Sequence, residues 1–503
     1  MLYLPTVKDN LIRYIDAGFP ILYIYTFEES KADKHIESVA RRHKVLEWNG
    51  ANGFVNFKTK SPLLPNQSLE STLSLLKNGN ELHRKLLVIK DADEQLEKSD
   101  VAVALLKEIA RKIRKSDDGI DSAVIIVSSK LRIPQALEKM ITVLELDFPD
   151  ENEISGIVNK FMDINGIPAV HAGLLEEMSL AFKGLSEFEI EDLLRLAISQ
   201  DGELTKKALK LIFDQKQQMI MKAGVLEMIP LKESIADIGG LENLKDWLQK
   251  KAKVFKNIRN AMDFGVTIPK GVLIAGVPGC GKSLSAKAAG KLFDVPLLRL
   301  DMGRLMGKYV GESEENMRKA IRLAEAISPC VLWVDELEKA FAGISGGGGG
   351  AEVTTRLFGT FLTWMQEKTS SAFVVATAND ITQLPPELLR KGRFDEIFYV
   401  PLPKPEERKK IFDIHINKRR KQDAGQIDID SLVSHTDGYS GADIEGVVNE
   451  SVESVFVKGN TALTTNEVLE CIRNTHSLSE IMKEELEEMD NQYQERKFKK
   501  ASR

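Results

Sequence analysis

Short runs of apolar residues recur along the chain and are separated by longer stretches of helical composition. In the C-terminal half the runs cover residues 271–275, 296–300, 331–334, 373–377 and 397–400. Short apolar runs with little alternation are typical of strands buried on both faces, as in parallel sheets. The pattern therefore predicts an open parallel α/β sheet with helices between its strands.

After Pro405 the pattern is helical almost throughout. It predicts a small all-helical lid followed by a charged terminal helix. The last stretch, residues 483–503, is first acidic and then basic, and we expect a solvated helix there.

The N-terminal half repeats this layout more faintly. Apolar runs at residues 20–26, 86–90, 123–127 and 143–146 predict strands, and residues 150–200 have helical composition. Residues 132–150 also resemble residues 383–405, because each segment places a proline after an apolar residue, then a short charged segment, then an apolar run. We interpret the chain as a tandem of two α/β units, each with a helical appendage. An unrelated α/β binding domain is the alternative for the first half.

Gly224 and Pro230 interrupt the helical pattern between the two halves. Together with the patterns above they predict four parts. These are an α/β domain at residues 1–150, a helical appendage and linker at 151–228, a second α/β domain at 229–403, and a helical lid with a C-terminal helix at 404–503.

Composition excludes several classes of protein. The 503 residues carry a net charge of −6, and without a long basic stripe nucleic acid is a disfavoured partner. Three scattered cysteines are too few for a disulfide framework or a zinc site. No apolar run approaches the ~18 residues of a membrane span, and the N-terminus lacks the layout of a signal peptide. We expect a cytoplasmic protein.

A glycine-rich loop follows the first strand of the second half. Residues 276–283, GVPGCGKS, fit the pattern G-x-x-x-x-G-K-S between a predicted strand and a predicted helix. In that context backbone N–H groups surround a β-phosphate, Lys282 reaches β and γ oxygens, and the Ser283 hydroxyl can bind Mg²⁺. The loop predicts binding of ATP and Mg²⁺.

Two acids follow the apolar run 331–334. Asp335 is suited to hold the metal and Glu336 to act as general base toward water, although a solvated acidic turn is the simpler interpretation of the pair alone. Asn379 ends the next strand and could orient the same water. Alone, it would be a turn-forming residue.

Six segments, in order along the chain, resemble the AAA ATPases. They are DIGGLENLK (237–245), the glycine-rich loop, GKYVGESEENMRKA (307–320), CVLWVDELEKA (330–340), ATANDITQLPPELLRKGRFD (376–395) and GYSGADIEGVVNE (438–450). The tandem arrangement and GTFLTWMQEKTS (359–370) are most similar to the cyanobacterial and plastid-encoded AAA proteins with a degenerate N-terminal half. The resemblance implies tandem AAA-like P-loop NTPase units, each a parallel sheet with a helical lid, the first of them degenerate.

The resemblance also implies an ATPase that forms a homo-oligomeric ring of six subunits, with ATP at the subunit interfaces. Arg390 and Arg393 match the arginine fingers, and Tyr309 matches the pore-loop aromatic that grips a protein substrate; otherwise these would be a pair of surface charges and an ordinary loop residue. With them, the implied catalytic residues are Glu336, Lys282, Asn379, Arg390 and Arg393, and the implied metal residues are Ser283 and Asp335. The implied nucleotide contacts are Ile238, Gly239, Pro278, Gly279, Cys280, Gly281, Lys282, Ser283, Leu284, His415, Gly441 and Ala442.

The implied function is ATP-driven remodelling or threading of protein substrates, in the cytoplasm or, for a plastid-encoded chain, the stroma. An ATP-gated assembly switch or scaffold is the alternative. A zinc protease is disfavoured because no H-E-x-x-H motif is present. The five-glycine tract at 346–350 falls at the second pore loop, where a simple linker would serve equally well.

Two residues depart from the family pattern. Glu338 stands where an aspartate is usual, which we interpret as a mild local change. Cys280 replaces a common threonine, and we expect Lys282 and the helix N-terminus to favour its thiolate. That expectation allows a redox brake on ATP binding, whereas the simpler alternative is a small tolerated side chain.

The first half lacks most of this chemistry. After its first strand it reads TFEESKADKH, with Glu28 and Glu29 where phosphates would lie, and two carboxylates repel a triphosphate. Asp91 persists as a candidate metal residue, Ala92 replaces the general base, Ser128 or Ser129 stands near the position of Asn379, and the finger arginines are missing. The sequence predicts that this half neither binds nor hydrolyses ATP tightly, and serves recognition or assembly.

Overall fold

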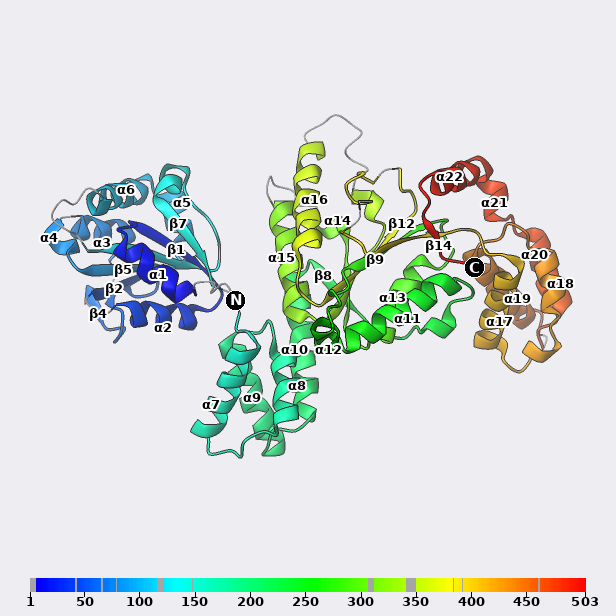
Figure 1. Cartoon of the computed structure of the whole chain (residues 1–503), viewed down its shortest axis with the longest axis horizontal. Helices are drawn as coiled ribbons and strands as arrows, with labels where there is room; N and C mark the ends of the chain where they lie inside the picture. The colour runs from blue at the N-terminus through cyan, green and yellow to red at the C-terminus, as the bar shows by residue number, and fades with distance from the viewer. Residues whose placement is uncertain are drawn as a thin grey trace. The chain divides into compact units, whose positions relative to one another are not determined.

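A computed structural model describes most of the chain (Figure 1). The described residues are 6–40, 43–64, 67–77, 79–114, 121–146, 148–305, 312–340, 350–382, 384–390, 392–459 and 462–503. Packing divides the chain into two units, Met1–Leu211 and Ile212–Arg503. Each unit is described by itself.

The first unit contains a seven-stranded sheet with the order β4-β3-β2-β5-β6-β1-β7. Its strands are β1 (Ile21–Tyr25), β2 (Lys44–Asn49), β3 (Gly53–Asn56), β4 (Pro62–Leu64), β5 (Lys85–Lys90), β6 (Ala123–Ser128) and β7 (Ile141–Glu145). Strands β2, β5, β6, β1 and β7 run parallel, whereas β3 pairs antiparallel with β2 and with β4.

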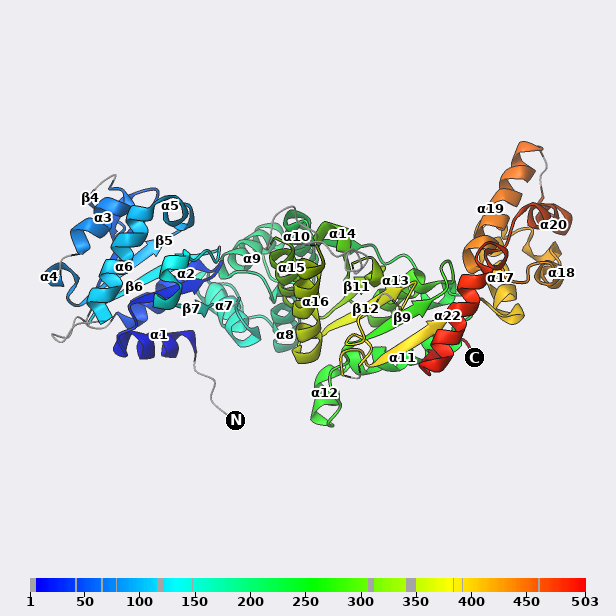
Figure 2. The same ribbon diagram turned by 90° about the horizontal axis from the view of Figure 1, so that it is seen from above.

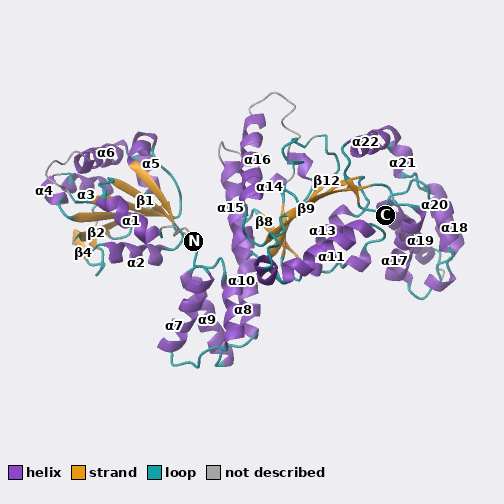
Figure 3. Ribbon diagram, in the orientation of Figure 1, coloured by secondary structure: helices purple, strands orange, loops and turns teal. Residues whose placement is uncertain are grey.

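Helices follow in two groups in this unit (Figure 3). Those that accompany the sheet are α1 (Val7–Asp16), α2 (Glu29–Val39), α3 (Leu69–Leu76), α4 (Gly79–Leu82), α5 (Asp93–Lys98) and α6 (Asp100–Arg114), with a 3-10 turn at Gln135–Met140. The helical appendage contains α7 (Glu151–Ile164), α8 (Ala172–Phe182) and α9 (Glu187–Asp201), and α10 (Lys207–Ala223) runs on into the second unit.

The second unit has a seven-stranded sheet with the order β14-β13-β9-β12-β11-β10-β8. Its strands are β8 (Leu226–Ile229), β9 (Gly271–Gly276), β10 (Leu297–Leu300), β11 (Cys330–Val334), β12 (Ala372–Ala378), β13 (Glu396–Val400) and β14 (Lys499–Lys500). All neighbours are parallel except β8, which pairs antiparallel with β10.

The helices of the second unit are those that precede β13 in the chain and those that follow it (Figure 2). The first group is α11 (Glu242–Lys256), α12 (Ile258–Asp263), α13 (Lys282–Phe293), α14 (Met302–Leu305), α15 (Glu312–Ile327) and α16 (Gly350–Glu367). The second group is α17 (Pro405–Arg420), α18 (Ile429–Ser434), α19 (Gly441–Val457), α20 (Thr465–Asn474), α21 (Leu478–Ile481) and α22 (Lys483–Glu495).

Five parallel strands occur in the same spatial order in both sheets. The series β2-β5-β6-β1-β7 corresponds to β10-β11-β12-β9-β13. In each series the fourth strand comes first in the sequence, followed by the first, second, third and fifth, as duplication of one unit predicts. The antiparallel additions differ, because the first sheet gains the β3–β4 hairpin and the second gains β8. The predicted tandem of two α/β units is therefore confirmed.

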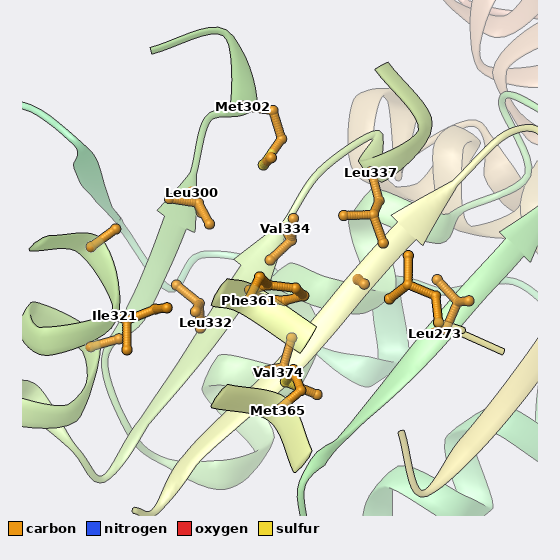
Figure 4. Packing of buried hydrophobic residues seen from close by; sticks show 14 of the residues in the cluster. Leu273, Leu300, Met302, Ile321, Leu332, Val334, Leu337, Phe361, Met365 and Val374 are labelled. Carbon is orange, nitrogen blue, oxygen red and sulfur yellow. The ribbon is translucent and has the colours of Figure 1, made fainter. Parts of the chain in front are cut away.

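Alternating residues of the strands build two cores in the second unit. Leu273, Leu332 and Val374 face α15 and α16 (Figure 4), whereas Val272, Trp333 and their neighbours face α11 and α13. Side chains of successive strand residues point to opposite faces, so apolar residues at every position give a sheet buried on both sides. The first unit repeats this arrangement with α3 and α6 on one face and α1 and α2 on the other.

Two stretches differ from the expectations above. Residues 226–228, expected in the linker, together with residue 229 form β8, which pairs with β10. The end of the C-terminal tail does not continue as a solvated helix: β14 pairs with β13, and Ala501 is fully buried. Its backbone N–H donates to Tyr399 O at 2.8 Å, and Ala501 O accepts from Leu244 N at 3.2 Å. Tertiary hydrogen bonds thus outweigh the weak strand propensity of KK.

Candidate active site

The glycine-rich loop joins the end of β9 to the start of α13. Gly279 and Gly281 have φ of 73° and 89°, in the left-handed region that favours glycine. A Cβ on Gly279 would lie 2.9 Å from both Ala442 Cβ and Ser440 Oγ. Glycine here therefore permits close approach between the loop and the first turn of α19.

Lys282 is the first residue of α13 and is 6 % exposed. Its Nζ donates to Gly276 O at 2.8 Å and to Val277 O at 2.7 Å. Burial lowers the pKa of Lys282 to about 8, against the attraction of nearby acids. A phosphate group beside this ammonium would supply a close charge partner.

Asp335 follows β11 and is held by hydroxyl groups from two other elements. Oδ1 accepts from Thr377 Oγ1 at 2.7 Å and from Ser283 Oγ at 3.3 Å. Oxygen donors of this kind suit Mg²⁺, which keeps several waters and phosphate oxygens as its other ligands. Among the described residues no group of three or more His, Cys, Asp or Glu side chains suited to a metal occurs. Ser283 and Asp335 would hold the ion.

Glu336 adopts a left-handed backbone conformation with φ of 49°. For a residue without special tolerance of this region the conformation costs on the order of 1 kcal/mol or more, and such strain concentrates at functional sites. The Glu336 N–H donates to Thr377 Oγ1 at 3.1 Å, and its carboxylate pairs with Lys339 Nζ at 2.5 Å. Thr377 thus fixes both acids, and the strained backbone sets the direction in which Glu336 points.

Glu338, interpreted from the sequence as a mild local change, is a buried residue that contacts the backbone of Asn379. It is 6 % exposed, and its Oε1 accepts from Asn379 N at 2.9 Å. Its Oε2 is buried with no hydrogen-bond partner among the described residues, and burial raises the pKa of the carboxyl. Glu338 therefore fixes the backbone that carries Asn379.

A pocket of about 620 Å³ adjoins the loop. The predicted contacts that line it are Ile238, Gly239, Gly279, Cys280, Gly281, Leu284, His415, Gly441 and Ala442. Ala442 N donates to Gly279 O at 3.0 Å, which closes the pocket between loop and lid. His415 is half-buried, with Nδ1 3.7 Å from Glu445 Oε1, and burial lowers the pKa of the ring. The structure thus gathers the predicted adenine and phosphate contacts, while Pro278, Lys282 and Ser283 complete the loop.

The remaining predicted residues lie apart from this pocket. Arg390 is exposed and Arg393 is half-buried with Nη1 bonded to Glu387 O. Tyr309 and residues 346–349 of the glycine tract lie outside the described residues. A larger open depression, about 680 Å³ between α15 and α16 with Arg318 and Trp364 in its wall, contains none of the predicted residues.

The expectation that Lys282 and the helix N-terminus favour a Cys280 thiolate is wrong. Burial raises the pKa of the thiol to about 11, which outweighs the opposing effect of the Lys282 charge. The thiol is therefore protonated at neutral pH, and thiolate chemistry is disfavoured.

In the first unit a carboxylate lies where the glycine-rich loop would be. Glu28 is 3 % exposed and precedes α2. Its Oε1 accepts from the backbone N–H of Glu187 at the start of α9, at 2.9 Å. Helix α9 begins with a capping box of Ser186 and Glu189, as α19 begins with one of Ser440 and Asp443. The start of α9 thus contacts the sheet domain of the first unit through Glu28, and the start of α19 contacts that of the second unit through the carbonyl of Gly279.

Sequence reasoning missed Thr377, the burial of Glu338, and Arg299, whose Nη2 lies 3.4 Å from Asp335 Oδ2. Thr377 precedes Asn379 by two residues and therefore points the same way from its strand, a signal that could have found it. Arg299 lies in an apolar run on another strand, and only the sheet brings it to Asp335.

Comparison with known proteins agrees with this geometry. Residues 272–402 match the ATPase family associated with various cellular activities (AAA), and residues 426–470 match the AAA+ lid domain. Residues 7–146 and 152–223 match the N-terminal and second domains of SpoVK-like AAA ATPases.

Relatives extend the similarity to nearly the whole chain. The uncharacterized AAA domain-containing protein ycf46 of Pyropia yezoensis is 36% identical over 493 residues, 96% of each chain. That of Guillardia theta is 36% identical over 511 residues, 100% of this chain and 97% of the relative. The cell division cycle protein 48 homolog of Archaeoglobus fulgidus is 36% identical over 224 residues, 43% of this chain and 29% of that protein. The resemblance inferred from the motifs is confirmed, and the chain belongs to the AAA ATPases, together with the ycf46 AAA domain-containing proteins.

Proposed function

We propose that this protein is a Mg²⁺-dependent ATPase whose second unit hydrolyses ATP at the interfaces of a homo-hexameric ring and thereby remodels or threads a protein substrate. The observation that carries the proposal is the pocket in which loop, lid and adenine-side residues meet beside Asp335 and Glu336. ATP would lie in this pocket, with its phosphates at Lys282 and Mg²⁺ at Ser283 and Asp335.

Each residue would have a separate task in hydrolysis. Glu336 would accept a proton from the attacking water, since its carboxylate follows the metal-holding aspartate at the same strand end. Lys282 would neutralise charge on the β- and γ-phosphates, and Asn379 would orient the water. When bound, Mg²⁺ would supply charge stabilisation between the phosphates.

The ring explains two arginines that lie apart from the pocket. Arg390 is exposed, so its guanidinium is available to a neighbouring subunit. We assign Arg390 and Arg393 to the γ-phosphate of that neighbour, where an arginine finger stabilises transition-state charge. We assign Tyr309 to the central pore, in contact with substrate.

An ATP-gated switch or scaffold is the second candidate. The contact between Glu28 and α9 favours it, because the first unit holds its own helical appendage without nucleotide. In this alternative the first unit binds a partner and ATP controls assembly. Tyr309→Ala separates the two, since threading would fail while ATP turnover continues, whereas a switch would be unaffected.

The test is ATP turnover per chain across a range of protein concentrations. We expect turnover to rise with concentration, and to disappear in Glu336→Gln and in Arg390→Ala. Mixing these two inactive variants should restore part of the activity, because one variant supplies the finger and the other the base at the mixed interface. Tight ATP binding with no turnover in the unaltered chain would favour the switch.

The cellular location of the protein is also a proposal. Among the described residues no helix is long and apolar enough to cross a membrane. We propose a cytoplasmic location, or the stroma for a plastid-encoded chain, and nucleic acid is not among the proposed partners.

A further inference from the structure

Arg299 is a cation beside the carboxylate that would hold the metal. It lies on β10, in register with Trp333 on β11, and Asp335 follows two residues after Trp333. Its Nη2 is 3.4 Å from Asp335 Oδ2, and its guanidinium carbon lies 5.1 Å from the centre of the Trp333 ring. Asp335 is thus held from both sides, by Thr377 on β12 and by Arg299 on β10.

The position of Arg299 is constrained by the sheet. Leu298 and Leu300 point into the core shared with α15 and α16, so Arg299 between them points to the opposite face, where Trp333 is buried. Figure 4 shows Leu300 beside Val334 on that first face. The indole provides a flat surface over which a guanidinium is favoured, and it directs Arg299 along β11 toward Asp335.

The hydrogen bonding of Arg299 is incomplete. Its Nε is buried and has no hydrogen-bond partner among the described residues, and its side chain is 34 % exposed. A planar guanidinium with unused donors forms its strongest contacts with carboxylate or phosphate oxygens. Asp335 is the carboxylate that it reaches.

We propose that Arg299 is a positioning residue that holds Asp335 when no Mg²⁺ is bound and competes with Mg²⁺ for that carboxylate, so that it sets the Mg²⁺ concentration required for nucleotide binding. This inference rests on the proposed function, because it concerns the same site. A cation within 4 Å of a carboxylate opposes a second cation there by Coulomb repulsion. Because the side chain is partly exposed, screening reduces this effect, and we expect a change of about tenfold in Mg²⁺ affinity.

The experiment measures binding of a fluorescent methylanthraniloyl-ADP by the full chain during titration with Mg²⁺. In Arg299→Gln the half-saturating Mg²⁺ concentration should fall about tenfold, and Arg299→Met should behave alike. Arg299→Lys keeps the charge but loses the planar group that stacks on Trp333, so its half-saturating Mg²⁺ concentration should lie between those of the unaltered chain and Arg299→Gln. Mn²⁺ binding with ADP, followed by electron paramagnetic resonance, should show the same order without any dependence on the fluorophore.

Lys251→Gln is a matched control. Lys251 also lies over an indole, Trp247 at 5.1 Å, and pairs with an aspartate, Asp395 at 3.2 Å, away from the nucleotide pocket. The half-saturating Mg²⁺ concentration of the Lys251→Gln variant should equal that of the unaltered chain. An unchanged or increased Mg²⁺ requirement in both neutral Arg299 variants overturns the inference, while nucleotide binding by the unaltered chain leaves the proposed function standing. Absence of nucleotide binding by the unaltered chain overturns both.

Discussion

The contact between Glu28 and α9 yields a prediction with a defined pH dependence. Burial raises the pKa of Glu28 from 4.5 to about 7, against lowering by the Glu187 N–H and the Lys31 charge and with smaller raising effects of Glu187 and Glu189. At about 1.4 kcal/mol for each pH unit between the two values, this difference corresponds to roughly 3 kcal/mol. Because the folded chain binds this proton more tightly than the unfolded chain, the stabilisation is complete below pH 4.5 and is lost as the pH rises through 7.

Two substitutions separate the charge of Glu28 from its hydrogen bond. Glu28→Gln keeps an oxygen that accepts from Glu187 N–H but cannot ionise. At pH 8 it should therefore be more stable than the unaltered chain by up to roughly 3 kcal/mol, with no difference near pH 4.5. Glu28→Ala removes the acceptor and leaves the partly buried Glu187 N–H unpaired, which should make it about 1–3 kcal/mol less stable than Glu28→Gln at every pH.

Hydrogen–deuterium exchange of the full chain measures this locally. The readout is the opening free energy of peptides within α9, corrected for the intrinsic effect of pH on exchange, with peptides of α13 as internal reference. Lys34→Gln is the control, because it breaks an exposed ion pair with Glu187 at 2.7 Å and should cost under ~1 kcal/mol without a pH step near 7. Equal stability of Glu28→Gln and Glu28→Ala, or a pH dependence retained in Glu28→Gln, would refute the reasoning.

Three further predictions concern the second unit. Near pH 8.5 ATP binding should take up a proton, because phosphates raise the lowered pKa of Lys282; calorimetry in buffers of different ionisation enthalpy would detect it, and Lys282→Met should abolish it. Deletion of residues 498–503 removes the hydrogen-bond partners of Tyr399 O and Leu244 N. Thermal unfolding should therefore show a free energy of unfolding lower by about 2–5 kcal/mol, whereas Arg503→Ala alone should change this free energy little. Iodoacetamide at pH 8 should label Cys280 far more slowly than a free thiol, because its pKa is raised to about 11; rapid labelling of the folded chain would contradict this.

Much of the fold could be predicted from apolar runs. The runs at 271–275, 331–334 and 123–127 each lie within an observed strand, because continuous apolar residues fit strands buried on both faces. Strand β2, KVLEWN, was missed because polar residues interrupt it, although its Glu47 pairs with Lys60 in the folded unit. Strand β14 was missed because two lysines have no strand pattern and are held by the hydrogen bonds of neighbouring residues.

In the candidate site, too, some features could be predicted from the sequence and others could not. The glycine-rich loop and the Asp335–Glu336 pair are local motifs, so their chemistry could be inferred from the order of residues alone. Arg299 and Glu338 act through Asp335 and Asn379, which follow the ends of other strands. Cys280 was misjudged because the half-buried thiol lines a pocket together with lid residues more than 150 positions later in the chain. Local charge alone predicted a thiolate, whereas desolvation, which depends on the whole fold, determines the outcome.

The two units therefore join core to lid by different means. In the second unit the joint is Gly279 O with Ala442 N, beside a pocket in which a nucleotide can add or remove contacts. In the first unit the group at the corresponding joint is the Glu28 carboxyl, which is part of the chain and cannot dissociate. A ligand can shift a conformational equilibrium only if it binds one state better than the other. We therefore expect ATP, where it binds, to alter the lid of the second unit alone, while the first unit keeps one arrangement whether or not nucleotide is bound.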